Sequence, residues 1–157
     1  MKNVYIGKVV NTHGIKGEIR ILSDFKYKDE VFVIGQNLII DDISYKIKSY
    51  RKHKSFDMVL LNEFDNINDV LFLKNKKVYT ERKNIKSRLI EDLIGYDVKV
   101  NNIFKGKVTD ITKNKVQEIL VVNNKYLVLY LKEFIENVDD KNKIINVKEV
   151  GGIFDEN

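Results

Sequence analysis

The sequence lacks several residue types that would mark particular classes of protein. Its 157 residues include no cysteine, proline, tryptophan or alanine, and only two are histidine. Without cysteine, disulfide bonds and thiolate metal sites are excluded. No segment approaches the roughly 18 consecutive apolar residues that a membrane-spanning helix needs. We therefore predict a cytoplasmic protein with no signal peptide, no membrane association, no bound metal and no cofactor.

Charge is distributed unevenly along the chain, whose formal net charge is +5. Residues 1–86 contain 17 Lys and Arg against 11 Asp and Glu, whereas residues 87–157 contain 11 against 12. This asymmetry suggests two modules with different surfaces, and it favours a nucleic-acid partner for the first. Only four of the basic residues are arginine. Because a Lys-, Asn- and Ile-rich composition also follows from A- and T-rich codons, charge alone does not decide the function.

Short segments with period-two alternation predict strands throughout the first half. The predicted strands are Val4–Val10, Glu18–Ser23, Asn37–Ile40, Tyr45–Tyr50, Asp57–Leu61 and Lys77–Thr80. A turn at Asp41-Asp42 separates two of them. The segment Asn66–Leu73 has helical spacing instead, with Asn66 as the predicted N-cap. One short helix before a final strand fits a barrel with a helical connection.

The second half repeats this organisation. We predict strands at Leu93–Val100, Phe104–Thr112, Gln117–Val122, Lys125–Leu131 and Lys143–Val147, and a short helix or turn at Lys132–Val138. Asn101-Asn102 and Asn123-Asn124 are the predicted turns. The dense apolar residues of 118–131 are mostly core, and any that are exposed would mark a protein interface. The fold class is mainly β: two small β-barrels, residues 1–82 and 92–157, joined by a short linker over residues 83–91, with one or two short helices.

The first candidate site is a glycine-dependent turn near the N-terminus. Gly14 and Gly17 interrupt an alternating strand, and glycine tolerates the positive φ that a tight turn requires. The turn would present Thr12, His13 and Lys16 on a rigid scaffold. Relief of a tight turn is by itself the commoner reason for such glycines.

The second candidate is the run Arg51-Lys52-His53-Lys54, the densest group of basic residues in the chain. It would neutralise RNA phosphates, or it is simply a solvated hairpin loop. A small enzyme with His13 as general base is a further alternative. The sequence offers His13 no adjacent nucleophile and no carboxylate in motif spacing, which makes this alternative the weakest.

The order of these landmarks resembles the RimM family of bacterial ribosome maturation factors. The similar segments are Gly7–Arg20, Arg51-Lys52-His53, Asn66–Leu73, Asp92-Leu93-Ile94-Gly95 with Val98, Glu133–Asp139 and Gly151-Gly152-Ile153. Two features depart from the family pattern. Arg88, Leu89 and Ile90 replace an aromatic cluster, and Leu129 stands near the position of a usual proline.

The resemblance implies an N-terminal RimM barrel, a C-terminal PRC barrel and a non-enzymatic role. Such a factor binds the immature head of the small ribosomal subunit, contacting rRNA and a ribosomal protein, and assists late assembly and rRNA processing. We expect it to act as a monomer. The candidate RNA- or ribosome-binding residues are Thr12, His13, Gly14, Lys16, Gly17, Arg51, His53 and Lys54. The alternative is a general RNA-binding barrel of the translation-factor type, without specificity for the ribosome.

Overall fold

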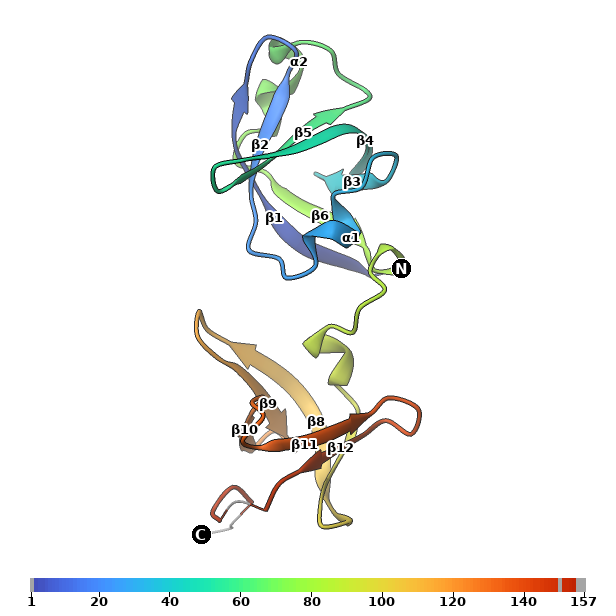
Figure 1. The fold of residues 1–157 in the computed structure, drawn as a ribbon, viewed down its shortest axis with the longest axis vertical. Coiled ribbons are helices and arrows are strands. Elements are labelled where there is room, and N and C mark those ends of the chain that lie inside the picture. Colours follow the sequence, from blue (N-terminus) through green and yellow to red (C-terminus); the bar gives the residue numbers. More distant parts are fainter. Residues whose placement is uncertain (1, 150, 155–157) are drawn as a thin grey trace. The chain divides into compact units, whose positions relative to one another are not determined.

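The computed structural model describes residues 2–149 and 151–154, and the chain divides into two compact units, Met1–Ser87 and Arg88–Asn157 (Figure 1). Both units are built mainly from antiparallel strands with a few short helices. In the described residues, no helix is long and apolar enough to cross a membrane.

The first unit is a closed six-stranded barrel with the strand order β1-β2-β5-β4-β3-β6. Its strands are β1 (Asn3–His13), β2 (Glu18–Leu22), β3 (Asn37–Ile40), β4 (Ile43–His53), β5 (Phe56–Leu61) and β6 (Lys77–Glu81). Its helices are α1 (Lys28–Val31), α2 (Ile67–Val70) and the 3-10 helices η1 (Leu71–Leu73) and η2 (Arg82–Asn84). Every strand predicted in this half is present.

The barrel core is filled by apolar residues that alternate with more exposed ones in strands such as β2 and β4. In β2, Ile19 and Ile21 are fully buried while Glu18 and Arg20 are not. The predicted helix is also confirmed: α2 and η1 follow one another, and the Asn66 side chain accepts a hydrogen bond from the Asn68 amide at 2.9 Å. Helix α1 was not predicted, since it is a single turn.

The turn predictions are confirmed by the backbone. Asp41 and Asp42 both have positive φ, at 55° and 64°, as do the pairs Asn101-Asn102 and Asn123-Asn124. Two consecutive residues with positive φ make the turn whose twist matches that of a hairpin. Asn and Asp tolerate this region better than other residues with a Cβ atom. These dipeptides therefore set three hairpins by local preference alone.

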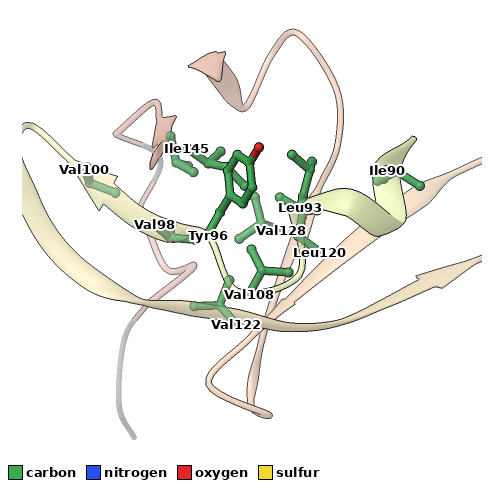
Figure 2. Packing of buried hydrophobic residues seen from close by; sticks show 11 residues of the cluster. Ile90, Leu93, Tyr96, Val98, Val100, Val108, Leu120, Val122, Val128 and Ile145 are labelled. Carbon is green, nitrogen blue, oxygen red and sulfur yellow. The ribbon is translucent and has the colours of Figure 1, made fainter. Parts of the chain in front are cut away.

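The second unit is a six-stranded, barrel-like sheet with the order β10-β9-β8-β7-β12-β11. Its strands are β7 (Asp97–Val100), β8 (Ile103–Lys113), β9 (Glu118–Val122), β10 (Tyr126–Leu129), β11 (Ile135–Asp139) and β12 (Ile144–Val147), preceded by the 3-10 helix η3 (Ile90–Leu93). Its core contains Leu93, Tyr96, Leu120 and Val128, whose side chains converge in Figure 2. The predicted mainly β fold class is confirmed for both units.

Two predictions in this unit are wrong over part of their length. Of the predicted strand Leu93–Val100 only Asp97–Val100 is a strand, because Leu93 ends the helix η3 and residues 94–95 form a turn. Only residues 132–134 of the predicted helix or turn at Lys132–Val138 are a turn, and the strand β11 begins at Ile135. The register of β11 against β12 shifts between Ile135 and Asn137. This bulge lets Ile135 and Val138, three residues apart, both pack against the core. The two core-facing residues of this strand therefore have the i, i+3 spacing that is typical of a helix.

The boundary between the units falls between Ser87 and Arg88, inside the segment predicted to be a linker. On the first unit's side, the Glu30 carboxylate accepts hydrogen bonds from the Lys86 and Ser87 amides at 2.6 and 3.0 Å. In the second unit, Arg88 forms an ion pair of 2.7 Å with Asp140. The family resemblance leads one to expect an aromatic residue at position 88. In this chain the residue is an arginine, and its side chain pairs with Asp140.

Candidate nucleic-acid interface

Side chains from four strands of the first barrel, β1, β2, β4 and β5, meet on its outer face. Inward-facing Ile19 pairs with Val59, and the next pair, Arg20 with Met58, therefore points outward. Met58 also pairs with Arg51 on its other side. Met58 is nevertheless fully buried. We infer that the aliphatic stems of Arg20 and Arg51 cover it from both sides. The Nε of Arg20 is itself buried, whereas the Arg51 side chain reaches the surface.

Arg20 links the two predicted candidate segments. Its Nη2 lies 3.2 Å from Nδ1 of His13, and because a guanidinium can only donate, Nδ1 is the acceptor. The guanidinium carbon lies 5.1 Å from the centre of the Phe56 ring, in cation–π geometry. The rings of His13 and His53 have their centres 6.2 Å apart. In the sequence 39 residues lie between these two histidines, and only the fold brings them together.

Arg51 is held by Glu18 in a two-pronged ion pair. Its Nε donates to Oε2 at 2.9 Å and its Nη2 donates to Oε1 at 2.8 Å. These hydrogen bonds lower the pKa of the Glu18 carboxyl, against the opposing effect of burial. The pair fixes the guanidinium plane without removing it from solvent, since 47% of the Arg51 side chain remains exposed. We call His13, Glu18, Arg20, Arg51, His53 and Phe56 the His–Arg face.

The other predicted binding residues lie outside the His–Arg face. Lys54 lies in the tight β4–β5 turn with a φ of 56°, and Lys16 is exposed in the β1–β2 turn. Gly14 and Gly17 both have positive φ, at 77° and 85°. Thr12 is half-buried near the end of β1. Gly14 and Gly17 thus shape the turn, and only His13, Arg51 and His53 of the predicted set belong to the His–Arg face.

Sequence reasoning missed Arg20, Glu18 and Phe56 as members of this face. The alternation Glu18-Ile19-Arg20-Ile21 already places Glu18 and Arg20 on one side of a strand, and this signal could have identified both. No comparable signal exists for Phe56. No group of three or more potential ligand side chains that could hold a metal ion occurs within residues 2–149 and 151–154.

Two family models together cover almost the whole chain. Residues 4–85 match the model described as the RimM N-terminal domain, and residues 90–153 match the RimM PRC barrel domain. The chain belongs to the RimM family. The resemblance inferred from the sequence motifs is thereby confirmed.

Curated RimM proteins align with this chain over almost their full length. The ribosome maturation factor RimM of Staphylococcus aureus is 34% identical over 167 residues, and that of Staphylococcus epidermidis is 32% identical over 165 residues. Each alignment covers 97% of this chain and 99% of the relative. A putative 16S ribosomal RNA processing protein RimM from Pseudomonas aeruginosa gives a TM-score of 0.48 at 18% identity, covering 95% of this chain and 98% of that structure.

A buried polar network supports the hairpin that carries Arg51 and His53. The Tyr50 hydroxyl donates to Oδ1 of Asp57 at 2.6 Å, and Nζ of Lys28 lies 2.9 Å from Oδ2. Asp57 is fully buried, and the Phe32 ring stacks on Tyr50 at 5.4 Å. This network joins helix α1 to both strands of the hairpin. The Lys28–Asp57 ion pair therefore anchors the single turn of α1 to the hairpin.

Tyr50 provides a pH-dependent test of this network. Burial, together with the hydrogen bond to Asp57, raises the pKa of Tyr50 to about 12. The folded state therefore holds this proton more tightly than the unfolded chain, whose tyrosines have a pKa of about 10. The resulting stability is fully present below pH 10 and is lost as the pH rises towards 12. We expect the alkaline absorbance difference between the wild type and Tyr50→Phe to show a midpoint near 12. A midpoint near that of the unfolded chain would contradict the network.

Proposed function

We propose that this protein is an assembly factor that binds the immature head of the small ribosomal subunit. It assists late assembly and rRNA processing as a cytoplasmic monomer and without catalysis. The first unit contacts rRNA or ribosomal protein through the His–Arg face and the β4–β5 turn. The observation that carries the proposal is the convergence of two arginines, two histidines and one phenylalanine on one outer face of the basic unit. Planar and cationic groups of this kind pair with phosphates and stack on bases.

The second unit supplies a surface of a different kind. Its residues carry 11 basic and 12 acidic side chains, counted from residue 87. Leu127 on β10 is 61% exposed, and Ile103 and Phe104 at the start of β8 are 60% and 55% exposed. Exposed apolar side chains on a nearly neutral unit favour a protein over a nucleic acid. We therefore assign the ribosomal-protein contact to this unit.

The mechanism requires only preferential binding. A protein that binds a near-mature arrangement of rRNA and protein more tightly than the alternatives shifts the population towards that arrangement. His13 lies next to Glu18 and His53, but all three belong to the open outer face of a sheet. Residues on such a face can bind and release rRNA or ribosomal protein without any covalent step.

Capture from cell lysate tests the proposed function. We expect the tagged full chain to enrich particles containing precursor small-subunit rRNA over mature subunits. Equal recovery of both, or recovery of unrelated RNA with a steep salt dependence, would favour a general RNA-binding barrel instead. An unrelated basic protein of similar charge is the control for electrostatic retention.

A further inference from the structure

A hollow in the first barrel lies beside the glycine-dependent turn. It has a volume of about 240 Å³ and is lined by Lys16, Lys48, Leu60, Phe64 and Asp65. These residues come from the β1–β2 turn, from β4, from β5 and from the loop that precedes α2. Leu60 stands two residues after Met58 on β5, so the hollow opens on the same side of that strand as the His–Arg face. It is smaller than a typical drug-sized pocket and suits a single planar group.

Phe64 is a rigid wall of this hollow. Its ring centre lies 5.2 Å from that of Tyr45 and 5.8 Å from that of Phe72. The contact with Phe72 is edge-to-face, and Phe64 itself is half-buried. Such aromatic pairs are mutually attractive and restrict ring motion. Little conformational entropy is therefore lost when a flat ligand stacks on the exposed part of the ring.

Three charged groups surround this apolar wall. Lys16, Lys48 and Asp65 are all exposed, and within the described part of the chain none of them forms an ion pair. Two ammonium groups are suited to phosphate oxygens. A carboxylate only accepts hydrogen bonds and is suited to N–H donors at the edge of a base. An aromatic wall with two lysines and one carboxylate matches a nucleotide better than an apolar peptide side chain, because an apolar side chain cannot interact favourably with the ammonium groups.

We propose that this hollow binds one unpaired RNA nucleotide, with its base stacked on Phe64 and its phosphates near Lys16 and Lys48. The favoured base is guanine, because its N1–H and N2–H groups present two adjacent donors to the Asp65 carboxylate. Uracil presents a single donor between two carbonyl oxygens that repel a carboxylate. This inference rests on the proposed function, since it identifies the form of RNA that the first unit recognises. Single-stranded RNA is generally read in this way, by stacking and by base-edge hydrogen bonds.

The experiment uses the full chain and two fluorescein-labelled probes, a short oligouridylate and the same oligonucleotide with one central guanosine. Fluorescence anisotropy at low salt should show at least about fivefold tighter binding of the guanosine probe, the lower end of the discrimination that a two-bond contact to a base edge provides. Phe64→Leu, which keeps an apolar side chain, should abolish this difference. Asp65→Asn should also abolish it, without weakening the binding of oligouridylate.

Asp42→Asn is the matched control, because Asp42 is an exposed acid in the β3–β4 turn and does not line the hollow. It should retain the guanosine preference. Asp65 is exposed, so Asp65→Asn tests the idea even if Phe64→Leu perturbs the fold. Equal binding of the two probes by the wild type, or a preference that survives in Asp65→Asn, would overturn the proposal.

Subunit capture separates this inference from the proposed function. If the wild type enriches small-subunit precursors but shows no guanosine preference, the nucleotide proposal is wrong and the assembly role is supported. If Phe64→Leu loses the precursors while its probe binding equals that of the wild type, the hollow accepts a protein side chain and the nucleotide proposal is overturned. Failure of the wild type to enrich precursors contradicts the proposed function itself.

Discussion

Replacing Gly17 by alanine is expected to lower the free energy of unfolding of the first barrel by about 3 kcal/mol. Gly17 has a φ of +85°, and a Cβ atom there would lie 2.7 Å from the carbonyl oxygen of Asn66. The left-handed backbone alone costs an alanine about 1–2 kcal/mol. Displacement of the adjacent backbone adds about as much again. The amide of Ile67 donates to the Ile15 carbonyl at 2.9 Å, so the displaced segment is also the one that anchors the turn.

Gly14→Ala is the control for this prediction. Gly14 also has a positive φ, +77°, but nothing lies within 4 Å of the position of its Cβ. It should lose only the conformational part, about 1–2 kcal/mol. Urea unfolding followed by circular dichroism measures both variants. Equal losses at the two positions would show that the close approach of Asn66 is unimportant.

Charge reversal of Arg51 and Lys54 together is expected to lower the affinity for small-subunit precursors by about 25-fold near physiological salt. Each phosphate contact that is lost costs about fivefold through counterion release, and two contacts multiply. Arg51 is held in place by Glu18, and Lys54 is exposed in the tight turn. Sedimentation of the full chain with purified precursors at several salt concentrations measures both the affinity and its salt slope. We expect the slope to fall by about two.

Because Arg51→Glu also breaks the ion pair with Glu18, a charge swap is the necessary control. The double variant Glu18→Arg with Arg51→Glu restores an ion pair and preserves the net charge of the His–Arg face. If the charge of the face is what matters, the swap should bind within about threefold of the wild type, because its count of phosphate-neutralising charges is unchanged. Affinity of the Arg51 and Lys54 reversal equal to that of the wild type would remove this turn from the interface.

Much of the fold could be predicted because it depends on local pattern. Alternation in Glu18–Leu22 predicts which residues of that strand face the core, and the pairs Asp41-Asp42 and Asn123-Asn124 predict hairpins through their tolerance of positive φ. Two of the failures have one cause. Helix α1 is a single turn held by the Lys28–Asp57 ion pair, and β11 carries a bulge that depends on its partner strand. Both require a contact that lies outside the segment itself.

The candidate site also has features that local sequence predicts and features that depend on the fold. The strands, the turns, the basic first half and membership of the RimM family can all be inferred from the amino-acid order, because each of these rests on the type and order of neighbouring residues. Folding is what brings His13 to His53, pairs Glu18 with Arg51 and places Phe64 beside Lys16 and Lys48 in a hollow. These neighbours come from different strands and loops of one barrel. Their proximity is set by strand pairing and barrel closure, which are properties of the whole unit and not of any segment.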